Sequence, residues 1–360
     1  MDKEYSFERV YQPFNITAKI KSQAEDFIVQ ENLSIDFTGE GEHCWLYIEK
    51  RHCNTDWVAT QLAKYCAVKK PAVSYAGLKD RRAVSSQWFS VQLPGRATPV
   101  WGEFESLMSQ SGTNETVRVL QCYRHNKKLQ RGALKSNSFK ITLRELSNTE
   151  DSCLETLLQR CDDISKKGVA NYFGSQRFGK NFNNLAQAEK LFLKPRYKLP
   201  RHKRSMYLSA SRSLLFNSIL SERVKQKVWD KRLAGDVFML DGKSACFKDV
   251  QDATGVTVLD SRLANREIHP AAILWGGGDS MVTLKAAQLE ADIIDQFPVF
   301  RDGLLAARLK AQRRACRVVP QNMCSSIEDG SFIVHFSLPP GSYATVVLAE
   351  IFSDIREVDI

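Results

Sequence analysis

Apolar and polar residues alternate along the first part of the chain with the period of two that is typical of half-buried β-strands. Ile16, Ala18 and Ile20, for example, alternate with polar residues. Further stretches rich in β-branched and aromatic residues cover 27–31, 44–48, 87–91, 116–120, 137–143 and 332–338. The pattern predicts that strands dominate up to about residue 145 and return after about residue 330.

Apolar residues three or four positions apart predict helices over 55–68, 152–167, 205–220, 284–294 and 343–351. We also expect a basic helix over 304–314, short strands within 235–250 and at 256–259, and a polar connection over 102–116. Six cations and two prolines in 194–204 argue against a regular element there. The order of elements predicts an α+β chain in which a discontinuous sheet domain is interrupted by an insertion.

The charge balance indicates a partner. The chain of 360 residues carries 51 Lys and Arg against 41 Asp and Glu, a formal net charge of +10. This excess favours a polyanionic partner, most simply nucleic acid, although a generic basic protein has the same balance. The length by itself suggests two domains.

Several other classes of protein are not indicated. The chain has nine cysteines, an odd number, and no two of them are spaced as C-x-x-C. This favours a reduced cytosolic protein without a disulfide framework. The neighbouring His and Cys at 43–44 do not predict a metal site, because adjacent strand residues point to opposite faces. We expect no nucleotide cofactor, since no Walker A or G-x-G-x-x-G sequence occurs. No signal peptide or membrane helix is recognisable, so we expect a cytoplasmic protein without membrane contact.

One loop is a candidate for chemistry. Asp80 lies among Lys79, Arg81 and Arg82, after an apolar run at 72–76 and before the predicted strand at 87–91. Three neighbouring cations should lower the pKa of its carboxyl and keep it ionised. An ionised carboxylate suits a nucleophile. A surface turn that carries charges of both signs would explain the same residues.

The residues of this loop resemble a known signature. Residues 76–87 read Ala-Gly-Leu-Lys-Asp-Arg-Arg-Ala-Val-Ser-Ser-Gln, similar to A-G-x-K-D-R-x-A-x-T-x-Q of the TruD-type tRNA pseudouridine synthases, with Ser85 where the family usually has Thr. Residues 171–179 match N-Y-F-G-x-Q-R-F-G, and Leu-Pro-Pro-Gly-Ser-Tyr-Ala-Thr at 338–345 is a third match. The three matches occur in order and span most of the chain.

The resemblance implies a fold and a division of the chain. The fold would be a pseudouridine-synthase-like mixed, mainly antiparallel sheet with flanking helices, interrupted by an inserted α/β domain. The catalytic domain would comprise residues 1–152 and 306–360, and the inserted domain residues 153–305.

The resemblance also implies roles for single residues. Asp80 would be the nucleophile, and Lys21, in a K-x-x-x-E-D-F match at 21–27, would lie close to it. Residues 128–139 resemble K-L-x-x-G-A-L-x-x-N-x-F, with Ser136 where Gly is usual. The side chains that would hold the base are Phe27, Asn137, Phe139 and Phe336. Arg177 would touch RNA or a loop of the active site. Without the resemblance, Lys21 would be read as a solvated charge and Phe27 as a core residue.

The activity implied by the resemblance is isomerisation of uridine to pseudouridine in tRNA, at uridine-13, by a monomer without a cofactor. Three steps are open to Asp80: attack on the ribose, attack on the base, or abstraction of a sugar proton. A non-catalytic RNA-binding protein of the same fold would keep the basic runs and aromatic residues without depending on Asp80. An RNA methyltransferase would need a glycine-rich strand–helix turn for its cofactor, and none is convincing.

Overall fold

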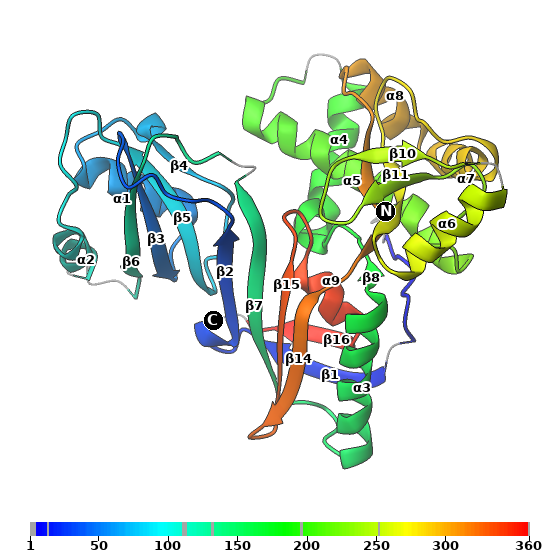
Figure 1. Cartoon of the computed structure of the whole chain (residues 1–360), viewed down its shortest axis with the longest axis horizontal. Coiled ribbons are helices and arrows are strands. Elements are labelled where there is room, and N and C mark those ends of the chain that lie inside the picture. Colours follow the sequence, from blue (N-terminus) through cyan, green and yellow to red (C-terminus); the bar gives the residue numbers. More distant parts are fainter. Residues whose placement is uncertain are drawn as a thin grey trace. The chain divides into compact units, whose positions relative to one another are not determined.

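The chain folds into two compact units. The computed structural model describes residues 5–12, 14–109, 114–130, 133–194, 197–250 and 253–358. The sheet unit comprises Phe14–Lys166, Pro320–Gly341 and Phe352–Ile360. The helical unit comprises Met1–Pro13, Lys167–Val319 and Ser342–Ile351. Each unit is therefore assembled from segments that are far apart in the sequence (Figure 1).

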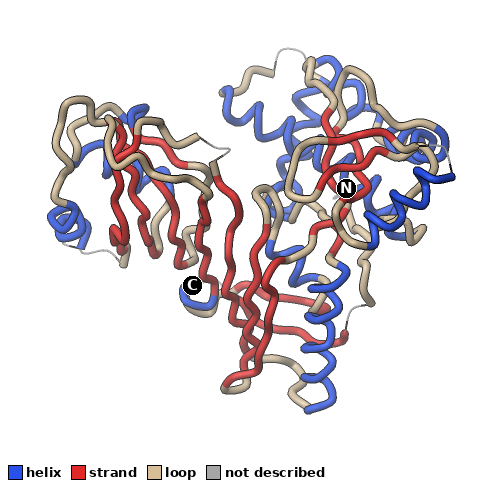
Figure 2. The backbone as a smooth tube through the Cα atoms, in the orientation of Figure 1, coloured by secondary structure: helices blue, strands red, loops and turns tan. Residues whose placement is uncertain are grey.

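The sheet unit is built on a ten-stranded sheet within the described residues, and its central strands run in the order β14-β15-β7-β2-β5-β3-β6. Two strand pairs, β1–β16 and β2–β5, are parallel, and the other pairs are antiparallel. Figure 2 shows the strands of this unit side by side. The strands are β1 (Phe14–Ile20), β2 (Phe27–Leu33), β3 (His43–Arg51), β4 (Val73–Tyr75), β5 (Val84–Gln92), β6 (Thr116–His125), β7 (Leu134–Arg144), β14 (Gln321–Glu328), β15 (Ser331–Leu338) and β16 (Phe352–Glu357).

Helices cover one part of this sheet. Helix α1 (Thr55–Tyr65) packs on β4 and β5, and α2 (Trp101–Ser109) packs on β6, while α3 (Asp151–Lys167) follows β7 (Figure 1). Alternate residues of β3 and β5 enter the core beneath α1, among them Leu46 and Phe89. These observations confirm the predicted fold class, α+β with a mainly antiparallel sheet and flanking helices.

The helical unit contains two small antiparallel sheets, with four strands in the order β10-β9-β11-β12 and two strands, β8 and β13. Its strands are β8 (Val169–Ala170), β9 (Val237–Leu240), β10 (Cys246–Lys248), β11 (Ile268–Leu274), β12 (Gln312–Ala315) and β13 (Arg317–Val318). Its helices are α4 (Asn183–Leu193), α5 (Arg201–Lys225), α6 (Ala253–Ala264), α7 (Leu284–Ile294), α8 (Pro298–Ala306) and α9 (Ala344–Ala349). Apolar residues of α5 form much of its core, because Phe216, Ile219 and Leu220 are fully buried.

Two predicted elements have the wrong type. The expected polar connection over 102–116 contains α2, because Phe104 is buried and Trp101 and Met108 pack beside it at helical spacing. The expected strand at 256–259 lies inside α6, whose Leu259 and Leu263 pack on the core. Tertiary packing overrides the strand propensity of the β-branched residues there.

Two further predictions miss an element boundary. The helix expected over 304–314 ends at Ala306 as α8, and Gln312–Ala315 instead pairs with β11 as β12. The irregular segment expected over 194–204 contains the start of α5 at Arg201. Pro195 and Arg196 of that segment, like Arg131 and Gly132 of the basic run before β7, lie outside the described residues. No helix in the described ranges combines the length and the apolar composition needed to cross a membrane.

Candidate active site

The candidate site is organised around the contact between Asp80 and Lys21 in the sheet unit. The Nζ of Lys21 donates a hydrogen bond to Oδ2 of Asp80 at 2.6 Å and to Oε1 of Glu357 at 2.9 Å. The Lys21 side chain is 4% exposed and that of Asp80 is 33% exposed. A buried ammonium therefore lies between two carboxylates, both of which are partly exposed to solvent.

The backbone of Lys21 is unusual. Its φ of +57° lies in the left-handed region, which residues other than glycine seldom occupy. Such a conformation costs of the order of 1–3 kcal/mol and persists where the surrounding structure enforces it. Here the turn after β1 directs the Lys21 side chain inward to Asp80.

Asp80 is ionised at neutral pH. Burial by itself would raise the pKa of its carboxyl, but the hydrogen bond from Lys21, the hydrogen bond from the Arg82 backbone N–H and the charges of Lys21 and Lys50 lower that pKa overall. The Arg82 N–H donates to Oδ1 at 3.0 Å. The direction agrees with the prediction from the sequence. A carboxylate held in this way can act as a nucleophile or a base.

The cations that lower this pKa are not the ones the sequence suggested. The Lys79 side chain pairs with buried Glu31, and the Arg81 Nε donates to the backbone oxygen of His52 at 2.8 Å. The Arg82 guanidinium donates to the oxygen of Val358 at 3.3 Å. The side chains of these neighbouring loop residues point to different partners, so Lys21, which follows β1, and Lys50 of β3 provide the charge instead.

Buried polar groups hold the loop that carries Asp80. Thr55 Oγ1 accepts a hydrogen bond from Lys79 N at 3.0 Å and donates one to Gln87 Oε1 at 2.8 Å. Gln87 Nε2 donates to the oxygen of Gly77 at 3.2 Å, and Lys50 Nζ donates to the oxygen of Asp80 at 3.0 Å. Nothing in the sequence marked Lys50 or Thr55 as part of the site, because both lie far from the signature at 76–87.

Three aromatic side chains continue from the charged pair. Lys21 Nζ lies 5.1 Å from the centroid of the Phe27 ring. The rings of Phe27 and Phe139 are 6.2 Å apart, and those of Phe139 and Phe336 are 5.5 Å apart. The registers Val29↔Phe139 and Phe336↔Phe139 place all three on one face of β2, β7 and β15. Cross-strand pairing thus brings together residues that are more than 300 positions apart.

Asn137 lies on the same face of β7 as Phe139, two residues earlier, and is paired in register with Glu31 and Leu338. Its Oδ1 atom is buried and receives no hydrogen bond from any described residue. A buried acceptor without a donor is costly, of the order of 1–3 kcal/mol. The arrangement suits an acceptor that is completed by a bound ligand.

Glu357 is a site residue that sequence reasoning missed. It ends β16, where it pairs with Ile20 of β1, next to Lys21. The sequence around it, Asp-Ile-Arg-Glu-Val, gives no distinctive signal, and β16 itself was not predicted.

Arg177 belongs to the helical unit. Its Nε donates to Tyr343 Oη at 3.0 Å and its Nη1 donates to Ser209 Oγ at 3.1 Å. A Cβ at Gly174 would lie 2.9 Å from the Tyr343 ring and 3.0 Å from Thr345 Oγ1, so only glycine fits there. The motif at 171–179 therefore packs on the second half of the motif at 338–345, through Ser342, Tyr343 and Thr345.

The chemistry available at the site is that of one carboxylate and its lysines. Among the described residues, no group of three or more His, Cys, Asp or Glu side chains could hold a metal ion. The ionised Asp80 and the buried Lys21 offer a nucleophile or base and a charge that stabilises it. Of the aromatic rings beside them, Phe27 and Phe336 are buried, at 7% and 2% exposure, and Phe139 is partly exposed. This combination suits a reaction on an unpaired base.

Comparisons with known proteins point in one direction. The family model for tRNA pseudouridine synthase D (TruD) matches residues 9–186 and 181–351. The protein named tRNA pseudouridine synthase D from Methylococcus capsulatus is 44% identical over 92% of this chain and 90% of its own length. The protein of that name from Hydrogenovibrio crunogenus is 40% identical over 93% of each.

The fold is also found among solved structures. A crystal structure from Methanosarcina mazei that carries the TruD designation superposes with a TM-score of 0.72. The match covers 96% of both chains at 21% sequence identity. At that identity the likeness shows a shared fold, which agrees with the fold class expected from the sequence.

Proposed function

The chain belongs to the tRNA pseudouridine synthase D (TruD) family, and from this premise we propose that it converts uridine-13 of tRNA into pseudouridine with Asp80 as its nucleophile. Pseudouridine formation in tRNA is supported by the family model and by relatives about 40% identical. The observation that carries the role of Asp80 is its ionised carboxylate, held at 2.6 Å by buried Lys21 beside the aromatic row.

The reaction breaks the bond between N1 of the base and C1′ of the ribose, turns the base, and joins it again through C5. No redox change or group donor is needed, so we expect no cofactor. The uridine first leaves its stack, at a cost of a few kcal/mol. Stacking on side chains returns about 1–3 kcal/mol per base, and Phe27, Phe139 and Phe336 provide the rings in this proposal.

Asp80 would act in its ionised form. Attack on C1′ of the ribose, attack on the base, and abstraction of a sugar proton all require a carboxylate without its proton. Lys21 would keep that form available and offset charge that develops as the glycosidic bond breaks. The unpaired Oδ1 of Asn137 would accept a hydrogen bond from the N3–H of the uracil.

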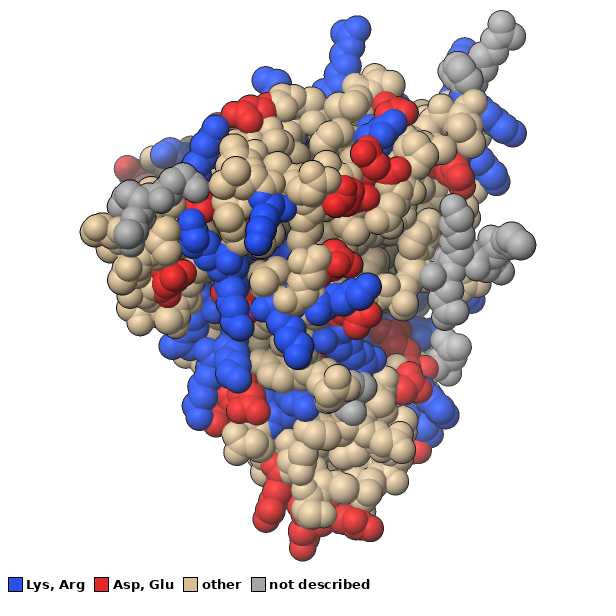
Figure 3. Space-filling model, turned by 90° about the vertical axis from the view of Figure 1, so that its right-hand side faces the viewer, with Lys and Arg blue, Asp and Glu red and all other residues tan. Residues whose placement is uncertain are grey.

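The remaining proposals concern binding of the RNA. The net charge of +10 favours a polyanion, and Figure 3 shows many Lys and Arg side chains on one face, with acidic side chains among them. We propose that Arg177 touches RNA or a loop of the active site. We propose that the insertion at 153–305, most of which lies in the helical unit, contributes to binding of a cytoplasmic tRNA by a monomer.

The decisive experiment maps pseudouridine in bulk tRNA from cells whose only copy of this enzyme is wild type, Asp80→Asn or Asp80→Ala. We expect pseudouridine at position 13 with wild type and none with either variant. The matched control is Asp56→Asn, which changes an exposed aspartate that pairs with Lys70 in the same unit and should leave modification intact. Folding and tRNA affinity are measured for every variant.

The outcomes separate the competing functions. Loss of pseudouridine with retained folding and tRNA binding supports Asp80 as the nucleophile. Full activity of Asp80→Asn contradicts that role, and a wild-type protein that binds tRNA but modifies none favours a non-catalytic RNA-binding protein. A transcript with cytidine at position 13 tests the site, because modification of other uridines in it would contradict the proposed specificity.

A further inference from the structure

Lys50 is a buried cation without an anionic partner. Its residue is 0% exposed, and no carboxylate of the described residues lies within ion-pair distance of its Nζ. An ammonium ion removed from water costs several kcal/mol unless it is paired. Buried lysines without a counter-ion are rare in proteins for this reason. The placement therefore calls for a physical explanation.

The contacts of Lys50 join two loops. Its Nζ donates to the backbone oxygen of Cys53 at 2.7 Å and to the backbone oxygen of Asp80 at 3.0 Å. Cys53 precedes α1, and Asp80 precedes β5. One ammonium group therefore binds the main chain of the proposed nucleophile, while Lys21 binds its side chain.

The strand pairing explains how Lys50 reaches this position. Side chains alternate along β3, so Leu46 and Ile48 enter the core beneath α1, and Lys50 is the next residue on that face. It pairs with Ser85 of β5, a fully buried residue whose Oγ has no hydrogen-bond partner among the described residues. The apolar row of β3 thus ends in a lysine where the sheet meets the Asp80 loop.

The charged and titratable groups that act on Lys50 come from the same two loops. They are Cys53, Asp80 and Lys79, and the charge of Lys79 is partly offset by its ion pair with Glu31. Burial is the largest influence and lowers the pKa of Lys50 to about 8. The positive charge of Lys50 in turn helps to lower the pKa of Asp80.

We propose that Lys50 is a positioning residue for Asp80, whose ammonium group fixes the main-chain carbonyl of the nucleophile and supplies a second positive charge near its carboxylate. This inference rests on the proposed function. Lys50 acts through Asp80 and does not touch the substrate. Loss of its proton weakens both effects, so catalysis declines when Lys50 becomes neutral.

Stability and catalysis should respond to pH in opposite directions. The pKa of Lys50 in the folded protein lies below its ordinary value of 10.5, so the unfolded chain binds the proton more tightly. The contribution of Lys50 to the free energy of unfolding therefore rises between about pH 8 and pH 10.5. A purely structural lysine would make catalysis follow stability, whereas a positioning lysine makes catalysis fall in the same window.

The experiment measures the single-turnover rate constant of pseudouridine formation in a tRNA transcript from pH 6.5 to pH 9.5, with enzyme in excess. Wild type, Lys50→Met, Lys50→Arg and the control Lys64→Met, an exposed lysine of α1, are compared. Thermal unfolding and tRNA affinity are measured at each pH. Titration of the substrate is common to all four proteins and cancels from the comparison.

We expect Lys50→Met to fold and to bind tRNA within about threefold of wild type, but to react about 10- to 100-fold more slowly at pH 7. The decline of the wild-type rate above about pH 8 should be absent in Lys50→Met and shifted to higher pH in Lys50→Arg. Lys64→Met should match wild type throughout.

Two results would overturn the proposal: a Lys50→Met rate equal to wild type, or an unchanged alkaline decline in both Lys50 variants. If neither variant folds, the wild-type profile decides, because a rate that stays level to pH 9.5 excludes the role. Asp80→Asn is run alongside. If Asp80→Asn is inactive while Lys50→Met is fully active, only this inference fails; if Asp80→Asn is active, the proposed function fails.

Discussion

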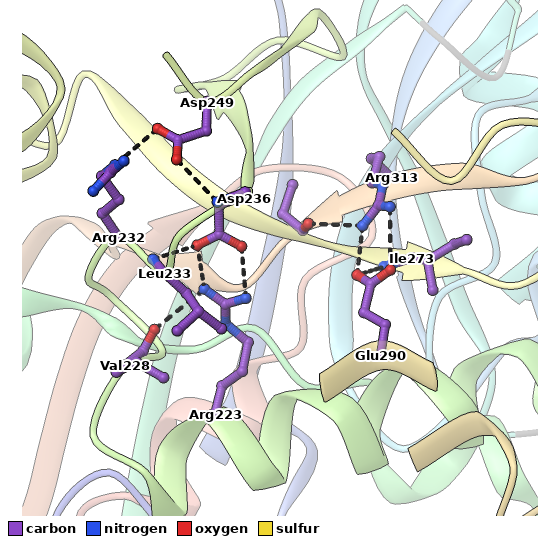
Figure 4. A network of polar contacts seen from close by, with 11 residues as sticks. Arg223, Val228, Arg232, Leu233, Asp236, Asp249, Ile273, Glu290 and Arg313 are labelled. Atoms are coloured by element: carbon purple, nitrogen blue, oxygen red, sulfur yellow. Dashed lines mark hydrogen bonds and ion pairs between the residues drawn. The ribbon is translucent and has the colours of Figure 1, made fainter. Parts of the chain in front are cut away.

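Each of the two units contains a buried group of charges, and the two groups are built differently. In the helical unit, Arg223 donates to both oxygens of Asp236 at 2.8 and 2.7 Å, and the side chains are 1% and 0% exposed (Figure 4). Nearby, Arg313 holds both oxygens of Glu290 at 2.5 and 3.1 Å. Every cation drawn in Figure 4 faces a carboxylate.

In the group around Asp80 in the sheet unit, the charges are not all paired in this way. Asp80 is one-third exposed, Lys50 has no carboxylate partner among the described residues, and Oδ1 of Asn137 has no donor there. Lys21 also has a strained backbone. Several local rules are broken here at once, whereas in the network of Figure 4 each arginine pairs with a carboxylate.

The difference distinguishes charges that stabilise the fold from charges that are available to a substrate. Both oxygens of Asp236 and of Glu290 accept hydrogen bonds from arginines, which join α5 to the residue before β9 and α7 to β12. These carboxylates therefore have little left to offer a substrate. Unpaired and strained groups are tolerated where binding or catalysis uses them, so they indicate function more strongly than the number of ion pairs does. The following variants test this distinction, from the largest expected effect to the smallest.

Asp236→Ala should have the largest effect, and it should be on stability. The change leaves the Arg223 guanidinium buried without its carboxylate, which costs about 3–5 kcal/mol of the free energy of unfolding. Urea unfolding followed by circular dichroism measures this. The double variant Arg223→Met with Asp236→Leu should recover part of the loss, and a single-variant loss below about 1 kcal/mol would contradict the closed-network interpretation.

Lys21→Met should act on catalysis. Removal of the ammonium group that holds Asp80 should slow the single-turnover reaction by about 10²- to 10³-fold. Lys21 lowers the pKa of Asp80, so that pKa rises in the variant, and the acidic decline of the rate should move to higher pH. Rate profiles from pH 4 to pH 8 measure both effects.

The matched control for that variant is Lys19→Met, which changes a lysine two positions earlier, in β1, that is partly exposed and paired with Glu145. It should leave the rate profile of wild type unchanged. An acidic decline of Lys21→Met at the wild-type pH would show that Lys21 does not control the ionisation of the catalytic group.

Phe139→Ala should lower kcat/KM by about 5- to 150-fold. This corresponds to the loss of about 1–3 kcal/mol, the usual contribution of one base–aromatic stack. Phe139 is the middle ring of the row, so its loss separates Phe27 from Phe336. Phe139→Tyr keeps the ring and is the control. Equal activity of the alanine and tyrosine variants would argue against stacking at this position.

Glu357→Gln should have the smallest effect. Its carboxylate holds Lys21 at 2.9 Å but is 48% exposed, and exposed ion pairs contribute about 0–1 kcal/mol. We expect less than about a fivefold change in the single-turnover rate at pH 7. A loss as large as that of Lys21→Met would place Glu357 among the catalytic groups.

Much of the sheet unit could be predicted because its side chains alternate cleanly. The strand expected at 332–338 lies within β15 (Ser331–Leu338), and the helix expected over 55–68 begins at Thr55 as α1. The helical unit was harder, since apolar and β-branched residues occur in both of its element types. For this reason 256–259 was read as a strand although it lies in α6.

The candidate site was predictable where a continuous signature marks it. Asp80, Lys21 and the three phenylalanines were expected together, and the structure connects them by direct contacts. Lys50 and Glu357 could not be found in this way, because each is an ordinary residue until strand pairing brings it to Asp80 or Lys21. The roles proposed for Asn137 and Arg177 remain predictions.

The sequence alone determined the family and the fold class, since motif residues are written along the chain. It also predicted the direction of the Asp80 pKa, but from cations other than those that cause the shift. Only the tertiary structure decided which cations act on Asp80. Lys79, Arg81 and Arg82 are its neighbours in sequence, yet their side chains bind elsewhere, while Lys21 and Lys50 reach it from β1 and β3. Electrostatic interactions depend on distance in space and on burial, and neither quantity can be read from the order of residues.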